Sequence, residues 1–221
     1  MKTEDFLKLY AKASGWESDV TVDDDLVPEY PCVKYHFGDK SVLSVCPEFE
    51  EKAGELFSGM SLEEALSHFF DLGEVELLRE RVLGFYADTP MDGEDLPDVT
   101  DGDALEEMLS AMPYEDRARG EVSADDDFSC CIWQSGKIIG AAGAVYDGVL
   151  ADISVCVHPD FRGKGLGKRL VAALCRKIRE KGIVSVYRVE EHNVPSLKVA
   201  EDLRMTLGFT MEGAQVVDPR L

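Results

Sequence analysis

The feature that most constrains this chain is a glycine-rich run between a predicted strand and a predicted helix. The run reads Arg162-Gly163-Lys164-Gly165-Leu166-Gly167. An alternating apolar strand, Leu150–Val157, precedes it, and a helix with apolar residues at helical spacing follows to about Lys181. A helix N-terminus leaves backbone N–H groups unpaired and carries partial positive charge, so it can bind phosphate. Glycines let an anion approach those N–H groups, and we therefore expect a diphosphate ligand.

Two common phosphate-binding patterns do not fit this run. A Walker A loop needs the pattern GxxxxGK followed by Ser or Thr, and that pattern is absent. The dinucleotide fingerprint needs G-x-G-x-x-G with an acidic residue about 20 positions later, whereas the glycines here run G-x-G-x-G and Glu190 meets the second requirement only loosely. A nucleotide-binding oxidoreductase is therefore the weaker alternative. Binding of NAD rather than CoA would support it.

The charge is distributed very unevenly. The net charge is −21, which argues against nucleic acid as a partner. Residues 1–150 carry 35 acidic and 11 basic side chains, whereas residues 151–221 carry 9 acidic and 12 basic ones. Eight basic residues and one acid fall within residues 162–181. This basic patch in an acidic protein is consistent with a local anionic ligand, and equally with a solvated helix face.

The order of predicted elements gives the fold class. The N-terminal part is predicted to hold helices at residues 4–14, from Ser61 to about 70 and at 74–85, a hairpin of strands 33–37 and 41–45, and a linker at 88–99. A helix at 101–112 comes next, then strands at 128–134, 137–146, 150–157 and 183–189, a helix from Asn193 or Ser196, and a strand around 215–217. The third and fourth of these strands are joined by a crossover helix and should be parallel. The sequence predicts an α+β fold with a mixed, mostly antiparallel sheet, a central parallel pair and flanking helices.

The C-terminal motifs resemble those of the GNAT acyl-CoA N-acyltransferase family. Arg162, Gly165 and Gly167 match its Arg-x-x-Gly-x-Gly signature, and the strand before them ends in a similar V-x-P-x-x-R sequence. Downstream, Asn193 and Ser196 resemble the start of the family's last helix, and Leu207-Gly208-Phe209 resembles its terminal L-G-F. The resemblance extends from about residue 128 to the C-terminus. It implies a GNAT-like domain at residues 91–221, preceded by a smaller α+β segment of unknown role at residues 1–90.

The resemblance also implies roles for particular residues. Backbone groups of Val155, Cys156 and Val157 would pair with the pantetheine arm of acetyl-CoA. The residues that would bind the diphosphate are Arg162, Gly163, Lys164, Gly165, Leu166, Gly167 and Lys168. Asn193 and Ser196 would contact the arm near the thioester, although a plain helix cap explains both residues as well.

The residues expected to handle protons are not in their usual places. The family's strand glutamate corresponds to Arg188, and its helix tyrosine corresponds to Ala200. Glu190 and Glu191 are the substitute candidates for the catalytic base, and a solvated loop is the ordinary explanation for such a pair. We expect an N-acetyltransferase that acts on a primary amine by direct attack in a ternary complex. A catalytically weak acyl-CoA sensor is the alternative.

The remaining expectations concern partners and surroundings. We expect the N-terminal 90 residues to line the acceptor site, where their acidity favours a cationic small-molecule or peptide amine. The net charge predicts no nucleic-acid partner. No apolar run is long enough to span a membrane and no secretory signal is apparent, so the sequence predicts a cytoplasmic protein. The six cysteines form no CxxC pair, so we expect buried, reduced thiols and no metal site.

Overall fold

The computed structural model describes residues 1–87 and 89–217, which form two compact units. The first unit consists of Met1–Gly84, Glu190–His192 and the described chain from Leu207 onward. The second consists of Phe85–Val189, apart from residue 88, and Asn193–Thr206. The units are sets of residues in mutual contact, and the domain boundary expected near residue 90 remains a prediction.

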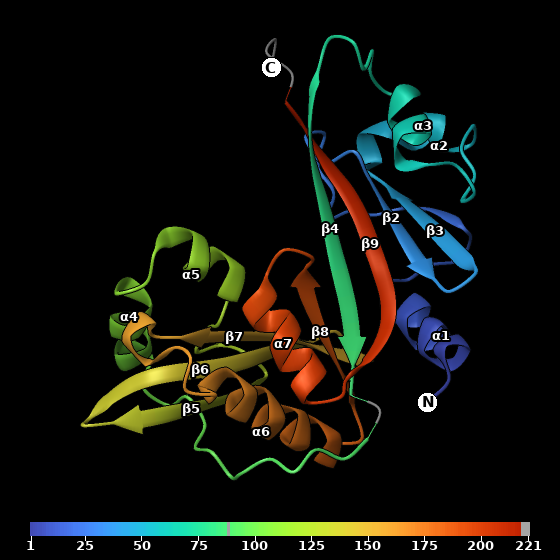
Figure 1. Ribbon diagram of the computed structural model, residues 1–221. Coiled ribbons are helices and arrows are strands. Elements are labelled where there is room, and N and C mark those ends of the chain that lie inside the picture. The colour runs from blue at the N-terminus through green and yellow to red at the C-terminus, as the bar shows by residue number, and fades with distance from the viewer. Residues whose placement is uncertain (88, 218–221) are drawn as a thin grey trace. The chain divides into compact units, whose positions relative to one another are not determined.

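The second unit is built on four strands flanked by helices (Figure 1). In spatial order the strands are β8 (Val184–Glu190, whose last residue belongs to the first unit), β7 (Leu150–Val157), β6 (Lys137–Tyr146) and β5 (Phe128–Gln134). Strands β5, β6 and β7 are antiparallel neighbours, and β7 and β8 are parallel. The helices are α4 (Gly102–Ser110), α5 (Tyr114–Gly120), α6 (Leu166–Glu180) and α7 (Val194–Asp202). The predicted α+β class with a central parallel pair is confirmed.

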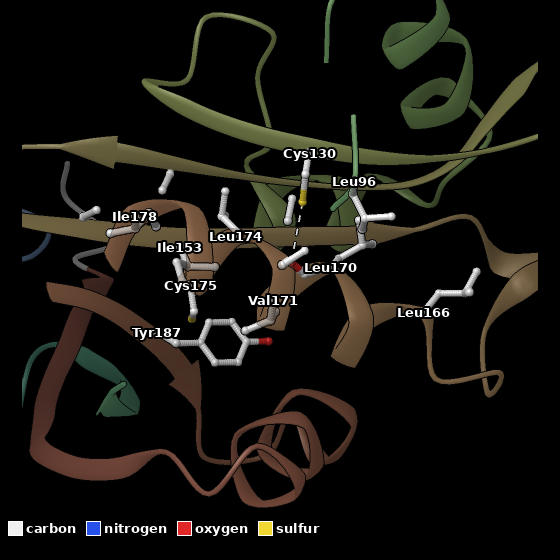
Figure 2. Close-up of a cluster of buried hydrophobic side chains, with 14 of the residues drawn as sticks. Leu96, Cys130, Ile153, Leu166, Leu170, Val171, Leu174, Cys175, Ile178 and Tyr187 are labelled. Atoms are coloured by element: carbon white, nitrogen blue, oxygen red, sulfur yellow. Dashed lines mark hydrogen bonds between the residues drawn. The ribbon is translucent and has the colours of Figure 1, made fainter. Parts of the chain in front are cut away.

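Each face of this sheet has its own apolar core. On one face, Leu170, Leu174 and Ile178 of α6 pack with Ile153 and with side chains of β5 and β6 (Figure 2). On the other face, Leu105 and Met108 of α4 pack with side chains of β6 and β7. Small residues of β6 allow this close packing, since the sequence Gly-Ala-Ala-Gly-Ala at its centre is buried throughout. The strands therefore separate an α6/α7 face from an α4/α5 face.

The segment predicted as a linker packs against α6. Of residues 88–99, the first lies outside the described residues. A Cβ atom at Gly93 would lie 2.6 Å from the carbonyl oxygen of Ala172, and Leu96 is buried in the α6 core. Glu94 pairs with Arg169 of α6 at 2.5 Å. The segment has no helix or strand in its described residues and forms a strap whose acids pair with the basic face of α6, and its role as a domain linker remains a prediction.

The first unit combines a second group of strands with short helices. In spatial order its strands are β1 (Val20–Val22), β3 (Lys40–Val45), β2 (Cys32–Phe37), β9 (Thr206–Val217) and β4 (Glu76–Tyr86). Its helical elements are α1 (Thr3–Ala13), a 3-10 turn at Pro47–Phe49, α2 (Glu50–Ala53) and α3 (Leu62–Ser67). The predicted hairpin is present as β2 and β3, and Ser61 and Glu64 form the predicted capping box.

Two local predictions need correction. Residues 74–85 were expected to be helical, but most of them lie in β4, next to β9. The last strand was expected around residues 215–217 and begins at Thr206. Both strands are defined by a neighbour distant in sequence, which short-range periodicity does not reveal.

The cysteines behave as small core residues. All six are free and buried. Cys130 packs in the α6 core and Cys131 in the α4 core, so these neighbours face opposite sides of the sheet as predicted. Burial raises the pKa of Cys130 to about 12 and the pKa values of Cys156 and Cys175 to about 11.

We predict that Gly93→Ala destabilises the protein by about 1–3 kcal/mol, because the added methyl group meets backbone atoms of α6 that cannot move cheaply. The control is Gly102→Ala at the start of α4, where the nearest atom to an added Cβ is 3.6 Å away. Urea unfolding followed by circular dichroism measures both. Equal stability of the Gly93 variant and the wild type would contradict the packing of the strap.

We also predict that a thiol reagent reacts slowly with the native protein at pH 8, because the thiolate is the reactive form and all six thiols are buried. Burial also raises the pKa values of Cys130, Cys156 and Cys175, which lowers their thiolate fraction further. All six should react at once in denaturant. Spectrophotometric titration with an aromatic disulfide provides the measurement. Fast reaction of any thiol in the native protein would show that it is accessible.

Candidate functional site

The glycine-rich run forms an open loop at the start of α6. Gly163 and Gly165 have φ of +74° and +77°, a region that residues with a side chain rarely adopt. A Cβ atom at either glycine would meet nothing within 4 Å, so the loop faces open space. No side chain caps the N-terminus of α6. Its first N–H groups therefore point to a place where an anion can approach.

Most of the basic side chains around the loop already have protein partners. Arg162 donates from Nε to the carbonyl oxygen of Val157 at 3.0 Å and pairs with Asp116 of α5 at 2.8 Å. Lys164 donates to the carbonyl oxygen of Asp160. Arg162 therefore links the loop to the end of β7 and to α5. These two contacts of its guanidinium stabilise the conformation of the loop. An anion at the loop would be held chiefly by backbone N–H groups.

The parallel strands β7 and β8 separate beside this loop. Their pairing covers Leu150–Val184, Ala151–Ser185 and Asp152–Val186, and no later pair joins them in the described chain. On its other side, β7 remains paired with β6 as far as Val157. The part of β7 that holds Val155, Cys156 and Val157 thus has one edge without a strand partner. An extended ligand with amide groups can pair with such an edge.

The start of α7 lies on the α6/α7 face, because Ala200 of α7 is part of the α6 core. Asn193 is the N-cap residue, and its Oδ1 accepts a hydrogen bond from the N–H of Ser196 at 3.3 Å. The structure therefore confirms that Asn193 caps the helix. Contact of Asn193 and Ser196 with a ligand remains a prediction.

The candidate bases Glu190 and Glu191 belong to the first unit. Glu191 pairs with Arg81 of β4 at 2.9 Å, and Glu190 lies 3.0 Å from Nε2 of His192. Both carboxylates are therefore already engaged with neighbouring basic side chains. Their catalytic role remains a prediction.

Asp152 is a further candidate residue that no sequence motif marks. It occupies the last pair of β7 with β8, and it forms an ion pair with Arg188 of β8. Its side chain is 34% exposed. Partial burial raises the pKa of Asp152, and Arg188 opposes that shift. A single acid in an otherwise apolar central strand was the signal available in the sequence.

A second carboxyl group lies on the same face of the sheet. A Cβ atom at Gly143 would lie 1.6 Å from Oδ2 of Asp126, so the carboxyl of Asp126 occupies the space that a side chain there would need. Gly143 pairs with Ser154 across β6 and β7, and directly opposed residues share a face. Ser154 and Asp152 alternate with Ile153 and therefore also share a face. Burial raises the pKa of Asp126, and two neighbouring aspartates raise it further.

The described residues hold no group of three His, Cys, Asp or Glu side chains arranged to bind a metal ion. Within the same part of the chain, every helix is too short or too polar to cross a membrane.

Comparison with known proteins identifies the family. The family model described as acetyltransferase (GNAT) family matches residues 95–204. A solved structure described as an acetyltransferase of the GNAT family from Novosphingobium aromaticivorans aligns with a TM-score of 0.54 at 19% identity, over 66% of this chain and 68% of that one. A GNAT-family acetyltransferase from Colwellia psychrerythraea aligns with a TM-score of 0.52 at 18% identity, over 78% of this chain and 75% of that one. The comparison with curated proteins gave no match.

At these sequence identities, the structural similarity shows a common fold. The match to the family model shows the family. The matched residues hold the glycine-rich loop, the separated strands and the start of α7. Through residues 95–204, this chain belongs to the acetyltransferase (GNAT) family.

Proposed function

We propose that the protein transfers an acetyl group from acetyl-CoA to a primary amine by direct attack in a ternary complex. The observation that carries this proposal is the open loop of residues 163–168 beside the unpaired edge of β7. The loop offers backbone N–H groups for the diphosphate, and the edge offers backbone groups for the amides of the pantetheine arm. The thioester then lies where β7 and β8 separate.

The acceptor approaches from the α4/α5 face in this proposal. Asp152 and Asp126 lie on that face, whereas the N-terminal turns of α6 and α7 pack on the other. Two carboxyl groups favour a cationic acceptor, because an ammonium group is attracted to them before it loses its proton. An amine of a small molecule or of a peptide meets this requirement.

The amine has to lose a proton before its nitrogen can attack the thioester carbon. Asp152 is suited to accept that proton because it is partly exposed, and its raised pKa makes the carboxylate a stronger base than an ordinary aspartate. Glu190 and Glu191 remain candidates for the same step, and each is engaged with a basic side chain, as Asp152 is with Arg188.

Turnover tests the proposed function directly. We expect release of free CoA when the protein is mixed with acetyl-CoA and polyamines or amino-terminal peptides, and slower release with neutral acceptors. Measurement of the CoA thiol at low salt follows the reaction. Tight CoA binding without turnover on any amine would instead support an acyl-CoA sensor.

The loop is tested by a matched pair of glycine variants. Gly163 and Gly136 both have positive φ and both face open space, but Gly136 lies in the turn between β5 and β6. Alanine should cost similar stability at both positions, about 1–2 kcal/mol. We predict that Gly163→Ala weakens CoA binding about tenfold, since its methyl group enters the proposed phosphate site, and that Gly136→Ala does not. Calorimetric titration with CoA gives the affinities, and an equal effect of the two variants would contradict the assignment.

The proton acceptor is tested by three amide variants. We predict that Asp152→Asn lowers kcat/KM about 100-fold, whereas Glu190→Gln and Glu191→Gln have smaller effects. In the wild type, kcat/KM should fall as the pH drops through the pKa of Asp152, which burial raises above that of an ordinary aspartate. This acid limb should disappear in Asp152→Asn. Full activity of Asp152→Asn with loss in either glutamine variant would assign the role to the glutamates.

A further inference from the structure

The side chain of Tyr187 carries a buried hydroxyl group without a hydrogen-bond partner among the described residues. Tyr187 is only 3% exposed, and its Oη makes no hydrogen bond to any described residue. The interaction with Ser196 lowers the pKa of this hydroxyl. A buried polar group without a partner costs free energy, and such exceptions call for a physical reason.

The position of Tyr187 supplies a reason. It directly follows Val186, which is the last residue of β8 that pairs with β7. Its ring packs in the α6 core together with Val171 and Cys175 (Figure 2). The nearby Ser196 lies in the first turn of α7. Tyr187 thus lies at the separation of the strands, where the proposed function brings the thioester, and its side chain is on the α6/α7 face.

The aromatic ring without its hydroxyl would fill the same space in this core and make the same apolar contacts. Phenylalanine has the same shape as tyrosine apart from the hydroxyl, so the hydroxyl adds nothing to the apolar contacts. What it adds is one hydrogen-bond donor, held rigidly between β8 and α7. A fixed donor that has no protein partner is available to a ligand.

We propose that Tyr187 is a catalytic residue that donates a hydrogen bond to the thioester group of acetyl-CoA as negative charge develops there. This inference rests on the function proposed above. During transfer the N–C bond forms, the C–S bond breaks, and the bonding pair leaves on sulfur, while the proton of the amine goes to the carboxylate base. Tyr187 shares its proton but keeps it, so its own charge does not change. Donors aimed at developing charge are effective because they need no reorganisation.

The ionisation of Tyr187 agrees with this role. Burial raises the pKa of the hydroxyl, and Cys175 and Cys156 raise it further, whereas Ser196 lowers it. The hydroxyl therefore stays protonated throughout the neutral range, as a hydrogen-bond donor must. Transfer of its proton to a departing thiolate would be unfavourable, because a thiol has the lower pKa.

The test is Tyr187→Phe, with activity and stability measured on the same protein. We expect kcat with acetyl-CoA to fall about 100-fold, as on removal of a single donor to developing charge, while the affinity for CoA stays unchanged. We also expect the Tm to rise by about 2–4 °C, because the variant no longer buries an unsatisfied hydroxyl.

The matched control is Tyr146→Phe. The hydroxyl of Tyr146 donates to the carbonyl oxygen of Gly148 at 2.7 Å, so its removal should lower the Tm slightly and leave kcat unchanged. Opposite shifts in Tm for the two variants would support an unpartnered donor at Tyr187.

Three outcomes would overturn the inference. An unchanged kcat for Tyr187→Phe would show that the hydroxyl plays no part in transfer. A fall in both kcat and Tm would show that it has a structural partner. Wild-type protein that turns over no amine would remove the proposed function and this role with it, whereas an active wild type with an equally active variant removes only the role of Tyr187.

Discussion

The second unit depends on where the pairing of β7 and β8 ends. After Asp152 and Val186 the two parallel strands are no longer joined, although both continue and both remain packed against α6. The end of the pairing leaves an edge of β7 without a partner and brings Asp152 and Tyr187 to the same region from opposite faces. The glycine-rich loop follows directly from the unpaired end of β7. The roles that we propose in binding the donor, accepting the proton and stabilising charge therefore fall on one short stretch of two strands.

The parts of the site with local sequence signals could be predicted. Glycines at positive φ, an apolar helix after a strand and an N-cap asparagine each leave a pattern within a few residues, and these elements lie where the sequence places them. The alternation of β7 also predicts which of its side chains share a face. The family resemblance rested on these same residues, and the matched sequence model confirms it.

The parts that depend on distant neighbours could not be predicted. Strand β4 has charged residues on both faces, and its sequence pattern predicts a helix. Its strand conformation depends on pairing with β9, which is distant in sequence. The strap around Gly93 looks like a linker because its acids find their partners on α6, more than 70 residues away in sequence. The roles proposed for Tyr187 and Asp152 depend on burial and on the end of the strand pairing, and residue spacing predicts neither property.

The central claim is that backbone groups of the loop and of the β7 edge bind CoA. Hydrogen–deuterium exchange with and without CoA tests this directly. We predict slower exchange of the amides in residues 155–168 when CoA is present, and no change in the hairpin of Cys32–Phe37 and Lys40–Val45. Protection confined to other segments, or no protection at saturating CoA, would contradict the assignment of this loop and edge as the donor site.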